Sequence, residues 1–158
     1  MKAITICQPW ASLIAVGAKR FETRSWDTDY RGQIAIHAGV KPFDKTLDEM
    51  FPRIEGVTAA EMEFIETVRE YIDDDYFPYG AVVATAELIG CWKITAKDFG
   101  RGSMPCIDNL LIPSNQERLF GDWTVGRYAW ELADVKALPE PVPARGHLKL
   151  WDWDGDAQ

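Results

Sequence analysis

The segment Gly80–Trp92 constrains the fold of this chain more than any other stretch of its sequence. It is long, apolar and rich in β-branched residues, and Glu87 is its one charge, a pattern typical of a strand. Five shorter strands are predicted, at Met1–Ile6, Phe21–Ser25, Gln33–Ala38, Tyr128–Leu138 and Leu148–Trp151. Because the strands do not alternate regularly with helices, the sequence predicts an α+β protein, a small and mostly antiparallel β-barrel with helices on its rim.

Two helices are predicted between these strands. The first covers Pro9–Val16, because proline suits the first turn and Gly17 suits the left-handed residue that ends a helix. The second covers Ala59–Ile72, where apolar residues recur at helical spacing behind Thr58, a suitable N-cap.

Two segments are predicted to lack regular structure. Residues 95–126 are interrupted by glycine and proline, and a run of this length is often functional. Residues 139–143 contain three prolines and are predicted to form a stiff connector.

Length and composition indicate one globular domain over residues 1–158. The chain is long enough to bury a core, and its 47% of hydrophobic residues excludes disorder. No apolar run approaches the roughly 20 residues of a membrane span, and the N-terminus lacks the apolar core of a signal peptide. We therefore expect no membrane partner and a cytoplasmic location.

The cysteine and histidine content argues against a metal centre. Cys7, Cys91 and Cys106 are odd in number and far apart, which is typical of reduced thiols. His37 and His147 are too few for a histidine-rich metal site. The sequence therefore indicates neither a metal nor an organic cofactor.

The negative charge of the chain is concentrated in one segment. The formal net charge is −8, and residues 41–78 contain four basic and eleven acidic residues, a net of −7. This segment is predicted to be an acidic helical insertion whose acids form a solvated helix face. The rest is nearly neutral and lacks a basic stripe for gripping a long duplex, which favours a small substrate or a single extruded nucleotide.

The segment from Gly17 to Arg24 is the strongest candidate for a functional site. It brings Lys19, Glu22 and Arg24 together around one turn, and strand alternation should place Glu22 and Arg24 on one face and Thr23 on the other. A cation and a carboxylate so close together can bind a substrate or transfer a proton. The structural alternatives are a surface lysine on a turn and an ion pair of Glu22 with either cation.

Five other residues are candidates for substrate contacts, each with a structural alternative. Trp26 and Tyr79 could stack on a base or pack in the core. Glu87 could accept from the exocyclic amine of cytosine or point to solvent. His37 could donate to a substrate oxygen or be a satisfied histidine at a strand end. Arg145 could close over a phosphate or pair with an acid.

Several of these residues belong to a pattern. The helix opening Gln8-Pro9-Trp10 and the spacing Gly17-x-Lys19-x-x-Glu22-x-Arg24 are followed by four matching segments at 34–38, 79–84, 128–132 and 143–146. In these features the chain resembles the ASCH domain family (activating signal cointegrator homology), whose fold is a PUA-like β-barrel. The resemblance spans nearly the whole chain outside the acidic insertion and residues 95–126.

The resemblance implies two kinds of function. Some small bacterial members are amidohydrolases that remove the acyl group from N4-acylated cytidines, while others bind RNA or modified bases, and some are described as nucleases. The lysine assigned to catalysis in the hydrolases corresponds to Lys19. Their threonine corresponds to Glu22, a departure from the pattern. The hydrolases have a further catalytic glutamate that has no clear match in this chain. Glu87 is a candidate for it only from its position in a strand.

We therefore expect an amidohydrolase acting on N4-acylated cytidine or a related modified pyrimidine nucleoside. Lys19 and Glu22 would transfer protons, Arg24 and Glu87 would hold the substrate, and Glu22 would favour direct attack by water because it has no hydroxyl nucleophile. The alternative is a non-catalytic module that binds RNA or a modified base. A nuclease fits less well, because the body of the chain has no cationic track.

Overall fold

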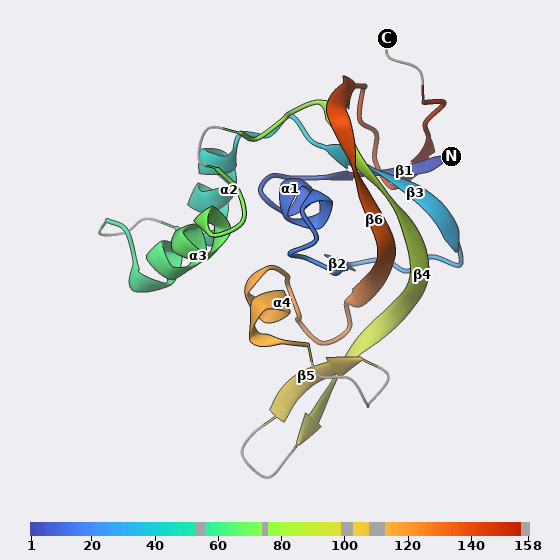
Figure 1. The fold of residues 1–158 in the computed structure, drawn as a ribbon. Coiled ribbons are helices and arrows are strands. Elements are labelled where there is room, and N and C mark those ends of the chain that lie inside the picture. Colours follow the sequence, from blue (N-terminus) through green and yellow to red (C-terminus); the bar gives the residue numbers. More distant parts are fainter. Residues whose placement is uncertain (53–55, 74–75, 99–102, 108–112, 156–158) are drawn as a thin grey trace. The chain divides into compact units, whose positions relative to one another are not determined.

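The computed structural model describes residues 1–52, 56–73, 76–98, 103–107 and 113–155 (Figure 1). In chain order its elements are β1 (Lys2–Ile6), α1 (Trp10–Ala15), β2 (Phe21–Arg24), β3 (Gly32–Ala38), α2 (Phe43–Met50), α3 (Ala59–Arg69), β4 (Ala81–Asp98), β5 (Ser103–Ile107), α4 (Asn115–Leu119), β6 (Tyr128–Pro143) and β7 (Leu150–Asp152). None of the helices among these residues is long and apolar enough to cross a bilayer.

The chain divides into two compact units. Unit 1 comprises residues 1–18, 34–86 and 135–158, and unit 2 comprises residues 19–33 and 87–134. Strands β4 and β6 are long enough to run through both units. Whether the two units behave as the single domain expected from the sequence stays a prediction.

The predicted α+β class is confirmed. The strands pair in the order β2-β6-β4-β3-β1-β7, with β5 added to β4. The β1–β3 pair is parallel, whereas β1–β7, β2–β6 and β4–β5 are antiparallel. Among the described residues this path starts at β2 and ends at β7, so the sheet is not closed into the barrel that we expected. Closure requires a partner on both edges of every strand, and these two short end strands each pair on one edge.

The long strands correct two expectations. Strand β4 continues to Asp98, and β6 continues through the proline-rich residues 139–143, which are therefore not a connector. Proline cannot donate to a neighbouring strand. In β6 the three prolines occur at every second residue, so their missing N–H groups all face the same edge and leave the other edge able to pair.

Residues 95–126 contain more regular structure than their glycines and prolines predicted. Strand β5 pairs with the end of β4 in a register that places Ile94 opposite Ile107. Helix α4 follows, with the Ser114 hydroxyl at its N-cap accepting from the Glu117 N–H at 3.1 Å. Both elements span only five residues, too few for a periodic pattern to stand out in the sequence.

The two predicted helices are confirmed, each with shorter bounds. Helix α1 ends before Gly17, whose φ of +78° is the expected left-handed conformation. Helix α3 begins after Thr58, whose side chain accepts from the Glu61 N–H at 3.1 Å. It ends at Arg69 rather than Ile72.

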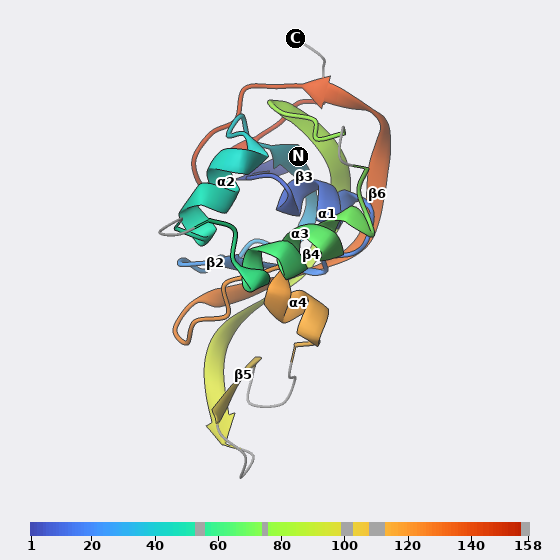
Figure 2. The same cartoon turned by 90° about the vertical axis from the view of Figure 1, so that its left-hand side faces the viewer.

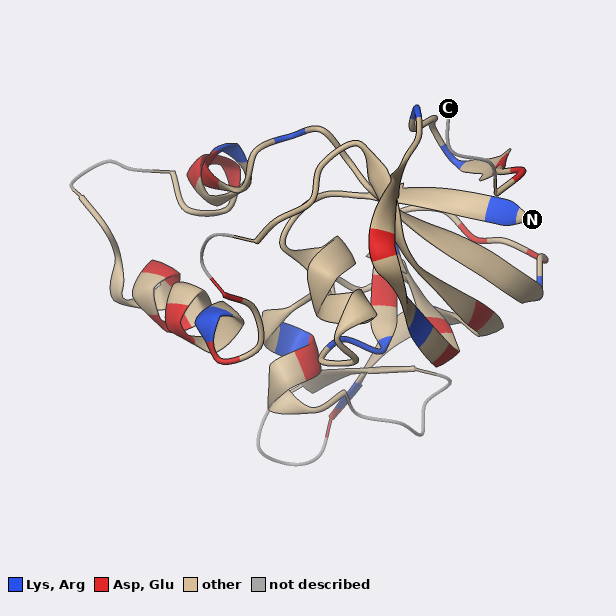
Figure 3. Ribbon diagram, turned by 45° about the horizontal axis from the view of Figure 1, so that its top comes forward, with Lys and Arg blue, Asp and Glu red and all other residues tan. Residues whose placement is uncertain are grey.

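The acidic insertion of unit 1 holds a helix pair with an aromatic interface. Helix α2, which we did not predict, lies beside α3 (Figure 2), where the Phe64 ring is 6.4 Å from Phe43 and 6.0 Å from Phe51 between centroids. Acidic residues line the outer turns of α3 (Figure 3), and Glu63 and Glu66 are exposed as a solvated face requires. Glu61 differs, because it is fully buried.

Candidate functional site

Lys19 is the most unusual residue of the predicted site, because it is a lysine with only 1% of its surface exposed. Helix α1 ends at Ala15, and the chain then leads through Gly17 and Lys19 into β2 of unit 2. The Lys19 ammonium donates to the main-chain oxygen of Phe120 at 2.7 Å and to that of Phe21. The alternative of a surface lysine on a turn is therefore wrong.

Glu22 joins the two cations of the site. Its Oε2 lies 3.8 Å from the Lys19 Nζ, and its Oε1 lies 3.0 Å from the Arg24 Nε. Strand alternation places Glu22 and Arg24 on one face, as predicted. Thr23 faces the other way and accepts from the Asp122 N–H at 3.0 Å through its hydroxyl. The ion pairs that we regarded as the structural alternative are thus present, and they also bring the proposed catalytic pair together.

Exposure increases along this row of charges. The Lys19 side chain is 1% exposed, that of Glu22 12% and that of Arg24 25%. The carboxylate and the guanidinium can therefore contact a ligand from solvent, and the lysine supports them from behind. Such an arrangement suits a proton reservoir behind a binding surface.

Burial lowers the pKa of the Lys19 ammonium below its usual value, because removal from water disfavours the charged form. Glu22 and Glu117 oppose this shift by attracting the charge, and Arg24 reinforces it. The net direction brings the amine closer to the range in which a lysine can accept a proton near neutral pH.

The lowered pKa predicts how stability depends on pH. In the unfolded chain Lys19 should titrate near 10.5. Between its folded-state pKa and that value the unfolded state binds more protons, so the free energy of unfolding should rise with pH. We expect wild type to gain stability relative to Lys19→Met as pH rises toward about 10.5. Urea unfolding of both proteins across this range measures the difference, and a constant or falling difference would contradict the prediction.

Glu117 belongs to this site, and our sequence analysis missed it. It is buried in α4, and its carboxylate accepts from the Arg20 N–H at 2.5 Å and from the Phe21 N–H at 3.3 Å. It therefore anchors the start of β2 next to Lys19. The spacing Ser114-x-x-Glu117 is the signature of a helix capping box and was the one signal available.

Two other predicted site residues also lie in unit 2. The Trp26 ring packs edge-on against Trp130 at 4.6 Å between centroids, and its main-chain oxygen accepts from the Trp130 indole. Glu87 is half-buried in β4. Across the part of unit 2 that the structure describes, no hydrogen bond or ion pair joins Glu87 to Lys19 or Glu22.

The remaining three candidates lie in unit 1. His37 is buried, its Nε2 is 3.0 Å from the Ala144 oxygen, and burial lowers its pKa. The satisfied strand-end histidine of our structural alternative is only half matched, because in the described part of the chain the buried Nδ1 of His37 has no hydrogen-bond partner. The Tyr79 hydroxyl accepts from the Phe43 N–H at 3.1 Å. Arg145 is exposed and lines a cavity of about 550 Å³ together with His37. These three residues therefore belong to unit 1, whereas Lys19, Glu22 and Arg24 belong to unit 2.

The described ranges contain no group of three or more histidine, cysteine, aspartate or glutamate side chains arranged to hold an ion. Cys7, Cys91 and Cys106 are free thiols.

Comparison with known proteins identifies the same family that the sequence pattern resembles. Residues 4–140 match the family model of the ASCH domain. Over 89 residues, or 56% of the chain, the sequence is 34% identical to proteins named activating signal cointegrator 1 from Mus musculus and Homo sapiens. The matched part spans 14% of the length of each of these relatives.

Proposed function

This chain belongs to the ASCH domain family, and from that membership we propose that it is an amidohydrolase removing the acyl group from N4-acylated cytidine or a related modified pyrimidine nucleoside. Family membership supports RNA or modified bases as ligands, and the hydrolytic reaction is the narrower proposal. The observation that carries it is the buried Lys19, with a lowered pKa, beside a carboxylate that reaches solvent.

Each of the three charged residues, Lys19, Glu22 and Arg24, has a role in this reaction. Glu22 holds a water molecule and takes its proton as the water oxygen bonds to the acyl carbon. The guanidinium of Arg24 faces the carbonyl oxygen, where negative charge develops. The bond from carbon to N4 then breaks as the departing amine takes its proton from Glu22, and Lys19, behind the carboxylate, is the proton reservoir that Glu22 draws on. The products are cytidine and a free carboxylic acid.

Glu22 supplies the first test of this scheme. Incubation of the protein with N4-acetylcytidine should release cytidine, measured by chromatography. Replacing Glu22 with glutamine removes the proton acceptor but keeps the shape, and should lower kcat/KM by at least about a hundredfold. The exposed Glu63, on α3 of unit 1, provides the matched control Glu63→Gln, which should keep wild-type activity. Trapping an acyl-enzyme intermediate would contradict direct attack by water.

A second function is favoured by the contacts of Lys19. Its ammonium donates to two main-chain oxygens, which also suits a lysine that only holds β2 in place. In that case the partly exposed Glu22 and Arg24 would bind a modified base or an RNA nucleotide without reaction. RNA affinity that falls with salt, together with no release of cytidine, would support this binding module over the enzyme.

A further inference from the structure

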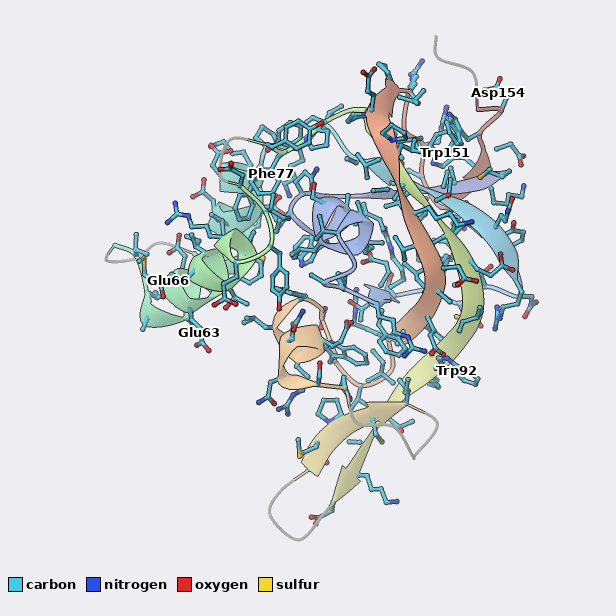
Figure 4. All side chains as sticks on the ribbon, in the orientation of Figure 1. Glu63, Glu66, Phe77, Trp92, Trp151 and Asp154 are labelled. Carbon is cyan, nitrogen blue, oxygen red and sulfur yellow. The ribbon has the colours of Figure 1, made fainter. Side chains whose placement is uncertain are left out.

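Trp92 is an exposed tryptophan held in a fixed position on unit 2. It lies on β4, with 37% of its surface exposed (Figure 4). Ile94, two residues along the strand, is in the buried cluster with Phe21 and Ala129. Trp92 therefore extends this face of the sheet into solvent.

The indole of Trp92 lies close against Gly90, two residues earlier on the same strand. A Cβ atom at this glycine would come within 2.2 Å of the Trp92 Nε1 and within 2.6 Å of its Cε2. Any other residue would therefore push the ring away. One side of the indole therefore packs against the strand at Gly90. The 37% of Trp92 that is exposed belongs to the rest of its surface.

Two polar contacts fix the orientation of the ring. The Trp92 Nε1–H donates to Glu131 Oε2 at 2.9 Å, and the other oxygen of Glu131 is held by the Arg20 guanidinium. The Arg20 side chain is 59% exposed, and its guanidinium lies 5.6 Å from the centroid of the Phe21 ring. The indole is therefore held in one orientation, and a cation shares its carboxylate partner, Glu131.

We propose that the exposed face of Trp92 is a stacking platform for one unpaired base of a single-stranded RNA, with Arg20 contacting the adjacent phosphate. Every base has an aromatic face, and proteins that bind single strands combine such platforms with nearby cations. The proposal rests on the proposed function only in taking nucleotides as the ligands of this domain.

The stacked base is a different nucleotide from the one at Glu22. In the β2–β6 pair, Phe21 is opposite Glu131 and Glu22 is opposite Trp130. Directly opposite residues share a face, so Glu131 and its partner Trp92 lie on the Phe21 face, whereas Glu22 and Arg24 lie on the other. A single strand that makes both contacts must pass the edge strand β2, so the platform concerns polymeric RNA and is separate from the hydrolysis of a free nucleoside.

The charge of unit 2 suits a binding site that contacts only a few nucleotides of an RNA strand. Its residues include nine lysines and arginines and ten acids, so it is nearly neutral, whereas the acidic excess belongs to unit 1. Few phosphates can be neutralised, and stacking must supply much of the affinity. We therefore expect RNA binding with a shallow dependence on salt.

The experiment measures binding of a fluorescent oligocytidine at low salt by anisotropy. Trp92→Ala should weaken binding about tenfold or more, and Gly90→Ala should do so with the indole still present. Trp92→Phe should retain most of the affinity. Ile89→Ala is the matched control, because Ile89 is an exposed apolar residue of the same strand with its side chain on the other face, and its affinity should be unchanged.

Three results would overturn the platform: no binding by wild type, unchanged binding by both Trp92→Ala and Gly90→Ala, or an equal loss of polyphosphate binding in Trp92→Ala. Circular dichroism checks that each variant is folded. Turnover of free N4-acetylcytidine should be the same in Trp92→Ala and wild type. If wild type shows no turnover but Trp92→Ala still weakens RNA binding, the hydrolase proposal fails and the platform stands.

Discussion

Replacing Lys19 with methionine should lower kcat/KM for N4-acetylcytidine by between about a hundredfold and ten-thousandfold, the usual contribution of a positioned proton-transfer group. Methionine fills a similar volume, which suits a site where Lys19 is 1% exposed. It cannot carry a proton, and it leaves the carboxylate of Glu22 with Arg24 as its remaining close cation.

Two further variants make this test specific. Lys19→Arg keeps the positive charge but cannot be deprotonated near neutral pH, so it should be as inactive as Lys19→Met. Lys93→Met removes an exposed lysine of β4 in the same unit and should keep wild-type activity. In wild type, activity should rise with pH up to the lowered pKa of Lys19. Full activity in Lys19→Arg would show that Lys19 acts only through its charge.

Replacing Glu117 with alanine should lower the free energy of unfolding by about 2 to 4 kcal/mol, because one buried and one partly buried main-chain donor lose their acceptor. These donors are the N–H groups of Arg20 and Phe21 at the start of β2. Urea unfolding followed by circular dichroism measures the loss. Arg118→Ala on the same helix removes an exposed contact to Asn115 and should change stability by less than about 0.5 kcal/mol.

Glu117→Gln separates the charge of this residue from its shape. The amide can still accept one of the two hydrogen bonds, so its cost in stability should be smaller than that of alanine. Loss of the negative charge removes an attraction that raises the pKa of Lys19. The pH at which activity rises should therefore move lower in Glu117→Gln, and a shift to higher pH would contradict the role assigned to Glu117.

The parts of this fold that depend only on residues close together in the sequence were predictable from the sequence. The end of α1 at Gly17, the N-cap at Thr58 and the common face of Glu22 and Arg24 all follow from local geometry. The lengths of β4 and β6 were not predictable, because strand length depends on pairing with distant segments. Proline at every second position of β6 appeared to exclude a strand, but its missing donors share one edge.

The candidate site divides in the same way. By itself the sequence determined which charges meet along β2, because a strand repeats every two residues. Only the tertiary structure decided that Lys19 is buried, since its partner Phe120 is 101 residues away and Glu117 reaches the adjacent main chain across 97 residues. A pKa depends on the surroundings of a group, and those surroundings are assembled by folding.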